Sequence, residues 1–170
     1  MNREKIEECY KWDLSKIYSS MNDFRSDIQL VKGKMNDFDK YKDIKYDENT
    51  LYEVISLSME VSRIISKLQV YTNLLSDEDT SINKNRELKE EISNLSSDFI
   101  NKTYFIEPNI LKIDYSLIEE YYKKNEKLLE YKRYLYKLFR YKEHTLSDSE
   151  EKLLANLSKV FGNNYETYEL

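Results

Sequence analysis

The sequence predicts an all-α fold, and three features of its composition carry that prediction. The chain of 170 residues has only two glycines and one proline, so it lacks the turn residues that strands and hairpins require. Charged residues make up 35% of the chain, which is typical of long helices with a solvated face. Apolar residues recur every three or four positions, which is the period of a helix. We expect a long antiparallel helical hairpin or bundle with one leading helix, followed by a second group of shorter helices.

Three regions are predicted within one lobe. Residues 1–20 lack sustained periodicity and form an N-terminal arm, which should pack three apolar side chains onto the body: Trp12, Leu14 and Ile17. Residues 21–107 form a long-helix bundle, and residues 108–170 form a second helical group. The boundary rests on Pro108, which we expect to open a short turn of helix because proline suits a first helical position.

The leading helix is expected over about residues 22–41. Ser20 or Asn22 could supply its N-cap, and Gly33 should weaken it slightly. Its apolar side chains follow steps of three and four residues: Met21, Phe24, Ile28, Val31, Met35 and Phe38.

Five further helices follow in the predicted order. Two long ones, over about residues 49–75 and 81–103, are joined by a short connection and should be antiparallel neighbours. Three shorter ones are expected over about residues 116–125, 127–142 and 147–161. The helix at 81–103 should bury one apolar stripe: Ile82, Leu88, Ile92, Leu95 and Phe99.

Charge and cysteine content limit the kinds of partner and the cellular compartment that we expect for the chain. The net charge is −5, which argues weakly against a nucleic-acid role for the whole chain. Its apolar runs are too short to span a bilayer, so no membrane partner is expected. The single cysteine, Cys9, cannot form an internal disulfide, and the first residues have no apolar signal core. These features predict a cytoplasmic location.

The histidine count excludes several kinds of catalytic site. His144 is the only histidine, so the His-Glu-x-x-His motif of a zinc peptidase cannot be formed within this chain. A closed structural zinc site needs four Cys or His ligands, and the chain offers two such residues. Two distant glycines cannot form a phosphate-binding loop. We therefore expect no catalytic, cofactor-binding or metal-binding residue in the chain, although a site made of carboxylates alone stays open.

A basic, tyrosine-rich segment covers residues 121–142. It holds eight cations and two anions, a local net charge of +6, together with six tyrosines. We favour a solvated helix face whose tyrosines and leucines, among them Leu128, Leu135 and Leu138, pack inward. A contact with a peptide or another domain comes second. Binding of single-stranded nucleic acid is the least favoured alternative.

Three segments, taken in order, resemble the oligoendopeptidase F family of thimet-type zinc peptidases. Residues 10–18, Tyr-Lys-Trp-Asp-Leu-Ser-Lys-Ile-Tyr, are similar to the family's opening Trp-Asp-Leu-Ser pattern. Residues 67–74, Lys-Leu-Gln-Val-Tyr-Thr-Asn-Leu, with Asp77 and Asp79, resemble a helix end of the family. Residues 140–155 resemble its His-Thr-Leu-Ser segment, and Ser147 and Glu150 there also form a capping box.

The resemblance implies a role for the chain within a larger enzyme. The parent would be a zinc-dependent oligoendopeptidase that hydrolyses short peptides, with zinc held in a C-terminal catalytic domain of the same polypeptide. This chain would be its N-terminal substrate-channel lobe and would be inactive alone. A fragment cut from such a protein could also self-associate through surface that the catalytic domain normally covers. The alternative is a free-standing helical adaptor that binds other proteins.

By the same resemblance, Arg140, Tyr141 and His144 form a structural or substrate-channel motif. His144 would order the turn before the capped helix through hydrogen bonds, and a substrate-facing role is the alternative.

Overall fold

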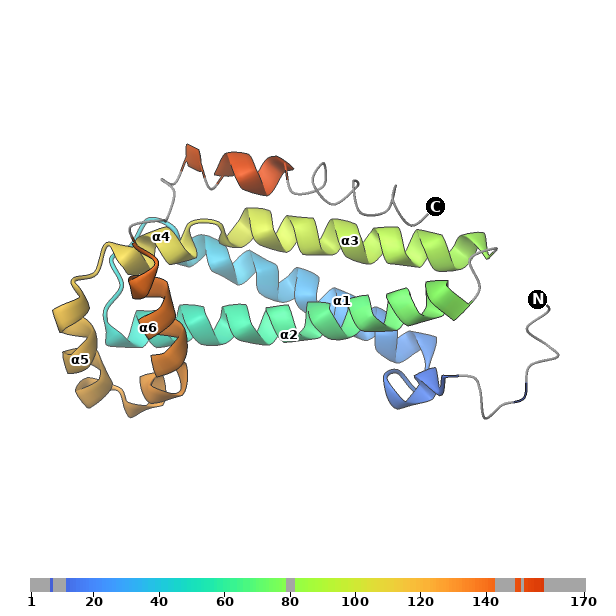
Figure 1. Cartoon of the computed structure of the whole chain (residues 1–170), viewed down its shortest axis with the longest axis horizontal. Coiled ribbons are helices and arrows are strands. Elements are labelled where there is room, and N and C mark those ends of the chain that lie inside the picture. Colours follow the sequence, from blue (N-terminus) through green and yellow to red (C-terminus); the bar gives the residue numbers. More distant parts are fainter. Residues whose placement is uncertain (1–6, 8–11, 79–81, 143–148, 151, 158–170) are drawn as a thin grey trace. The chain divides into compact units, whose positions relative to one another are not determined.

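The computed structural model describes residues 7, 12–78, 82–142, 149, 150 and 152–157, and these residues form helices and turns (Figure 1). The predicted all-α class is confirmed. The chain divides into two compact units. Unit 1 comprises Met1–Lys34 and Val61–Ser96, and unit 2 comprises Met35–Glu60 and Ser97–Leu170. The predicted domain boundaries at residues 20 and 107 stay a prediction.

The leading helix, α1 (Met21–Met35), forms where the apolar stripe predicts it. Ser20 caps it, since its hydroxyl oxygen accepts a hydrogen bond from the Asp23 backbone nitrogen at 3.2 Å. Its stripe is buried except at Met21, which is 39% exposed. The helix ends six residues earlier than predicted, because the chain tightens into a 3₁₀ helix, η4 (Asn36–Tyr41). Phe38 and Tyr41 are three residues apart, which is the 3₁₀ period, and both are buried.

The aromatic anchor near the N-terminus is Tyr18 rather than the predicted Trp12. Trp12 is 54% exposed, and Leu14 and Ile17 are only half-buried. A short 3₁₀ helix, η3 (Leu14–Lys16), is capped by Asp13 and turns the chain so that Tyr18 points inward. The Tyr18 ring packs edge-on against Phe24, with ring centroids 5.4 Å apart. The prediction that Trp12 packs onto the body is therefore wrong.

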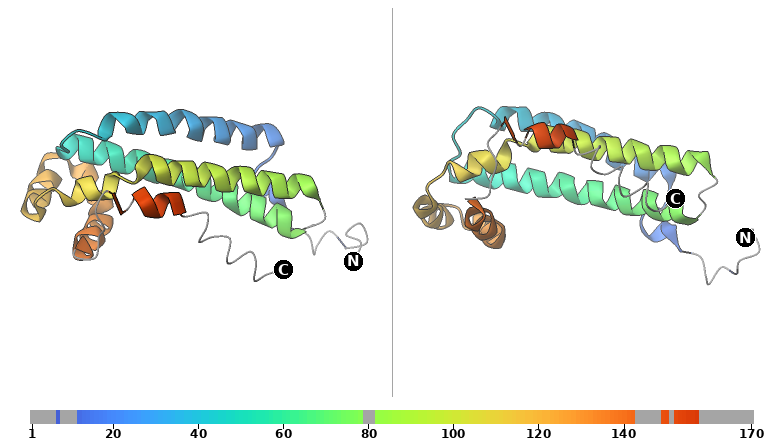
Figure 2. Two further views of the ribbon diagram at one scale, coloured as in Figure 1. Left: turned by 90° about the horizontal axis from the view of Figure 1, so that it is seen from above. Right: turned by 45° about the horizontal axis from the view of Figure 1, so that its top comes forward.

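Two long helices follow, α2 (Glu48–Glu78) and α3 (Asn83–Thr103). Asp47 caps α2, with its carboxylate 2.8 Å from the Thr50 backbone nitrogen. In unit 1 the end of α2 and the start of α3 lie side by side (Figure 1 and Figure 2). There the Asn85 side chain donates a hydrogen bond to the Leu75 carbonyl oxygen at 2.9 Å. This bond closes the chain reversal.

The predicted stripe of α3 is largely correct. Leu88, Ile92 and Leu95 are buried, and Phe99 is half-buried. Ile82 is an error, since it lies before the helix and is 44% exposed. Residue 81, where this helix was predicted to begin, lies outside the described residues.

Unit 2 continues with four short elements: α4 (Ile106–Leu111), α5 (Tyr115–Lys124), η5 (Glu126–Tyr131) and α6 (Lys132–Arg140). Pro108 is the third residue of α4, not the first. It is tolerated there because the first backbone N–H groups of a helix have no partner within the helix. The predicted helix over 127–142 is divided at Tyr131, whose backbone angles of −100° and 7° are not α-helical.

The core of unit 2 is formed by aliphatic side chains from each short element. Ile110, Ile118, Leu128 and Leu135 are fully buried. The Tyr121 hydroxyl donates a hydrogen bond to the Tyr46 carbonyl oxygen at 3.2 Å, which fixes α5 to the segment before α2. Residues 149, 150 and 152–157 are helical, but Ser147, which would be the N-cap of the predicted capping box, lies outside the described residues. Within the described part of the chain, no helix is long and apolar enough to cross a membrane.

Candidate functional site

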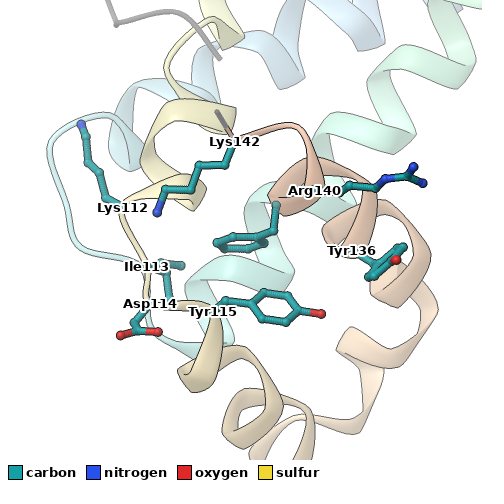
Figure 3. A pocket seen from close by; sticks show the side chains of 8 residues that line it. Lys112, Ile113, Asp114, Tyr115, Tyr136, Arg140 and Lys142 are labelled. Atoms are coloured by element: carbon teal, nitrogen blue, oxygen red, sulfur yellow. The ribbon is translucent and has the colours of Figure 1, made fainter. Parts of the chain in front are cut away.

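A pocket of about 740 Å³ opens on the surface of unit 2. One wall is the connection between α4 and α5, residues 112–115. The other is a face of α6 with the residues just after it (Figure 3): Tyr136, Phe139, Arg140 and Lys142. Two segments that are more than 20 residues apart in the sequence therefore meet at one concave surface.

The first wall is positioned by an N-cap. The Asp114 carboxylate accepts hydrogen bonds from the Ser116 backbone nitrogen at 3.0 Å and from its hydroxyl at 2.9 Å. These bonds, with the nearby charge of Lys142, hold the pKa of the Asp114 carboxyl below its ordinary value. The carboxylate is thus ionised at neutral pH and already engaged in starting α5.

The second wall follows from helix geometry. Tyr136, Phe139 and Arg140 are spaced i, i+3 and i+4, which places them on one face of α6. The adjoining face carries Leu135 and Leu138, which are buried. Burial of these leucines fixes the rotation of α6 and so turns the aromatic and basic face to the pocket. The prediction that Leu128, Leu135 and Leu138 pack inward is confirmed. The predicted burial of the tyrosines is correct for Tyr121 and Tyr122 and wrong for Tyr136 and Tyr141, which are exposed.

A hydrogen bond between side chains ties α6 to α4. The Tyr134 hydroxyl donates to the Glu107 carboxylate at 3.1 Å. Burial and the adjacent carboxylate both raise the pKa of Tyr134 above its ordinary value, so the hydroxyl keeps its proton. The donor in this bond is therefore present across the physiological pH range.

The pocket has an aromatic lining. The rings of Tyr115 and Phe139 are in contact, with centroids 5.0 Å apart and planes inclined by 56°. Ile113 adds an aliphatic surface beside them and is itself buried. Tyr115 is 44% exposed and Tyr136 is 56% exposed. Exposed rings of this size beside a concavity are available to a ligand.

Cations are found at both ends of the pocket. In Figure 3, Lys142 extends over the side where Lys112 lies, whereas Arg140 extends over the side where Tyr136 lies. Lys112 donates a hydrogen bond to the Asn109 side chain at 2.9 Å. The Lys142 ammonium lies 6.0 Å from the Phe139 ring centroid. With three cations and one engaged carboxylate, the lining carries a net positive charge.

The pocket includes one of the three residues nominated from the sequence. Arg140 lines it. Tyr141 does not; it is 57% exposed, and the Arg140 guanidinium lies 6.0 Å from its ring centroid. His144 lies outside the described residues. The sequence reasoning missed Tyr115 and Tyr136, although the Asp-Tyr-Ser cap and the helical spacing of Tyr136 with Arg140 were visible signals.

The cations of the basic segment, residues 121–142, lie on a solvated face, as the sequence predicts. Its eight lysine and arginine side chains are all exposed. Several lie over tyrosine rings; for example, Lys132 lies 5.5 Å from the Tyr122 ring centroid. Among the residues that the structure describes, no group of three or more His, Cys, Asp or Glu side chains could hold a metal ion.

Comparisons with known proteins agree on one family. A family model described as Oligopeptidase F matches residues 109–170, which include the whole pocket. The Group B oligopeptidase PepB of Streptococcus agalactiae serotype III (strain NEM316) is 28% identical over 170 residues, which cover 99% of this chain and 28% of that protein. The chromosomal oligoendopeptidase F of Lactococcus lactis subsp. cremoris is 32% identical over 155 residues, which cover 86% of this chain and 25% of that protein.

A solved structure has the same fold. The crystal structure of oligoendopeptidase-F from Enterococcus faecium matches with a TM-score of 0.80 at 24% identity, covering 86% of this chain and 28% of that one. The chain thus spans about a quarter of the length of the relatives it matches.

Proposed function

Because this chain belongs to the oligoendopeptidase F family as its N-terminal region, we propose that it is the substrate-channel lobe of a zinc-dependent oligoendopeptidase that hydrolyses short peptides. One observation carries the proposal: the similarity covers 99% of this chain but only 28% of a relative named as an oligopeptidase. The reacting groups would then lie in a further domain of the same polypeptide.

The chain itself supplies binding surface rather than chemistry. It has one histidine, and its described residues hold no group that could bind a metal ion, so they do not fit a catalytic zinc. A zinc ion in the catalytic domain would activate water for hydrolysis. What remains for this chain is to bind, orient and admit the peptide.

Long helices suit one wall of a channel. The helix α2 has 31 residues, about 45 Å at the usual rise per residue. Its buried face includes Leu51, Val54 and Leu68, all at 0% exposure, so the helix is held by packing along much of its length. A wall of this kind admits short peptides and excludes folded proteins if it faces a second lobe across a narrow gap.

Within this proposal, Arg140 and Tyr141 would belong to a structural or substrate-channel motif, and the third residue of that motif, His144, lies outside the described residues. Arg140 has the better support, since it lines the pocket of unit 2.

The proposal is tested by the coding sequence and by the activity of its full product. We expect codons beyond Leu170 to encode His-Glu-x-x-His, and we expect the complete polypeptide to cleave an internally quenched peptide of about ten residues. A chelator should abolish cleavage, and added zinc should restore it. A folded protein that contains the sequence of the same peptide should stay intact. Absence of the motif, or a purified full-length product without peptidase activity, would overturn the proposal and favour a free-standing adaptor.

Self-association of the isolated chain stays a prediction. Unit 2 exposes several large apolar side chains, among them Leu117, Leu129 and Tyr136. Light scattering at increasing concentration should show dimers or larger species if these side chains normally contact another domain. A strict monomer would contradict that expectation.

A further inference from the structure

We propose that the pocket of unit 2 binds the C-terminal end of a peptide. Arg140 and the Tyr136 hydroxyl would hold the terminal carboxylate, and the rings of Tyr115 and Phe139 would receive the last side chain. This assignment rests on the proposed function only in choosing a peptide as the ligand. The anionic and apolar character of that ligand follows from the pocket itself.

The electrostatic argument starts from Arg140. Within the described residues, this guanidinium forms no ion pair; its recorded neighbour is the Tyr141 ring, 6.0 Å away. An arginine without an ion pair among the described residues can offer two parallel N–H donors to one carboxylate. Tyr136 lies beside it in Figure 3 and is 56% exposed, so its hydroxyl can add a third donor.

The one acidic group in the lining does not cancel this charge. Asp114 already accepts two hydrogen bonds from Ser116 at the start of α5. In Figure 3 it lies on the opposite side of the pocket from Arg140, on the side where Lys112 also lies. Lys142 extends over that side too, and its charge lowers the pKa of Asp114. The Arg140 end therefore attracts an anion, whereas the Asp114 end is partly neutralised.

The apolar part of the pocket lies between these two ends. Tyr115 and Phe139 form a ring pair with centroids 5.0 Å apart, and Ile113 lies next to them in the lining. The volume of about 740 Å³ is within the range of sites for small organic ligands, about 300–1,000 Å³. The pocket therefore suits a ligand that has a carboxylate beside one large apolar group: the carboxylate would lie at the Arg140 end, and the apolar group would lie against the two rings.

A peptide C-terminus with an apolar last residue meets this requirement. The terminal carboxylate and the last side chain are bonded to the same Cα atom, so the two groups are always adjacent. The main alternative is nucleic acid, whose phosphates and bases could use the same cations and rings. The net charge of −5 disfavours that ligand, because a long polyanion would be repelled by the rest of the chain.

The test compares two ligands that differ in one group. The probes are N-acetyl-Ala-Ala-Phe as the free acid and the same peptide as its C-terminal amide. Each is titrated into the isotope-labelled 170-residue chain and followed by amide NMR shifts. We expect the acid to bind with shifts concentrated at residues 112–115 and 136–142, and the amide to bind about tenfold more weakly, since it lacks the charge-assisted hydrogen bonds.

Matched variants separate a specific contact from a general charge effect. Arg140→Gln should weaken binding of the acid about tenfold and leave binding of the amide unchanged, and Tyr136→Phe should weaken binding of the acid by a smaller factor. Arg133→Gln is the control, because it removes the same charge from an exposed position of α6 that does not line the pocket. It should bind the acid as the wild type does. Circular dichroism on each variant confirms that the helices are retained.

Each other outcome overturns the assignment. Equal affinity for acid and amide, equal loss in Arg140→Gln and Arg133→Gln, or no binding of either peptide would exclude a carboxylate site here. Binding of an oligothymidylate that depends on Arg140, without binding of the acid peptide, would assign the pocket to phosphates instead.

A second arm separates this inference from the proposed function. In the full-length polypeptide, Arg140→Gln should raise KM for free-acid peptides about tenfold and leave KM for the amides unchanged. If peptides are cleaved but acid and amide respond alike, the pocket assignment fails and the proposed function stands. If nothing is cleaved but the chain still prefers the acid over the amide, the proposed function fails and the carboxylate site stands.

Discussion

Tyrosines and cations are used differently in unit 1 and at the pocket of unit 2. In unit 1 they are satisfied by the fold: the Tyr18 hydroxyl donates to the Asp27 carboxylate at 2.7 Å, and the Lys67 ammonium lies 3.2 Å from the same oxygen. The Lys67 ammonium is also 3.9 Å from the Tyr18 ring centroid. In unit 2, Tyr136 and Arg140 instead border an open pocket. Amino-acid composition alone therefore does not locate a binding surface. The surface is found where the fold leaves tyrosine hydroxyls and cationic side chains without a hydrogen bond or ion pair among the described residues.

The helices explain the difference. Unit 1 is formed by parts of three long helices, whose stripes bury rings against each other; Phe24 and Tyr71, for example, have centroids 5.2 Å apart. Unit 2 adds short elements of six to ten residues. A segment made of short helices has many helix ends, and each end exposes side chains and capping groups at the junction with the next element. The pocket forms at such a junction.

The largest expected effect is on the core of unit 1. Phe24→Ala should lower the free energy of unfolding by about 3–5 kcal/mol, because Phe24 is fully buried and contacts the rings of Tyr18 and Tyr71. Urea denaturation followed by circular dichroism measures the change. Ile118→Ala is the counterpart in unit 2 and should cost about 2–5 kcal/mol.

The control for both is Trp12→Ala, which should change the free energy of unfolding by about 0.5 kcal/mol or less because Trp12 is exposed. Since α2 and α3 contribute residues to both units, we expect one transition in every variant. Two separate transitions would show that the units differ in stability as well as in the use of their polar groups.

The next effect concerns alkaline pH and unit 2. Burial raises the pKa of Tyr46 from 10.0 to about 12. A group whose pKa is raised in the folded state contributes its full stability below the unfolded pKa and loses it as the pH rises to the folded value. The free energy of unfolding should therefore fall between pH 10 and pH 12, by about 2 kcal/mol from this group.

Tyr46→Phe should remove that share of the pH dependence. Denaturation curves at intervals across pH 9–12 for wild type and variant give the comparison. Identical slopes for the two proteins would show that another group is responsible.

A smaller effect tests the polar network of unit 1 against an exposed ion pair of unit 2. Lys67→Met should cost about 1 kcal/mol, because the ammonium contacts both a half-buried carboxylate and a ring. Lys102→Met removes an ion pair with Asp39, whose side chain is 64% exposed, and should cost about 0.5 kcal/mol or less. Thermal unfolding at low and high salt measures both. Equal losses of stability in the two variants would show that the Lys67 contacts of unit 1 stabilise the fold no more than the exposed ion pair of unit 2.

The smallest effect is a gain. Gly33 lies inside α1, and a methyl group added there would meet no atom within 4 Å. Gly33→Ala should therefore raise the free energy of unfolding by about 0.5–1 kcal/mol, since alanine loses less conformational entropy in a helix. An unchanged or lowered melting temperature would mean that α1 is limited by something other than its glycine.

Helical periodicity predicted most of the fold, and its failures have local causes. It located α1, α2 and α3 because each has a stripe long enough to average over single residues. It missed the 3₁₀ elements, since Phe38 fits a spacing of three as well as one of four. Outside the periodic segments, size and apolarity alone placed Trp12 inside, but the buried ring of that region is Tyr18, whose hydroxyl donates a hydrogen bond to Asp27.

The pocket was accessible to sequence reasoning only in part. Arg140 was nominated through a resemblance, not through its surroundings. Its partners across the pocket lie in residues 112–115, and no periodicity relates the two segments. Their meeting depends on tertiary contacts such as the Tyr134 hydrogen bond to Glu107, which a single sequence does not encode in its spacing.

The exposure of Trp12 affects how unfolding of this protein can be followed by fluorescence. The chain has 16 tyrosines and one tryptophan, and that tryptophan lies in unit 1 with more than half of its surface already in water. Its emission should shift little on denaturation. A tryptophan fluorescence trace could therefore stay almost flat while the helices around the pocket unfold, and only tyrosine absorbance or the amide signal would record the event.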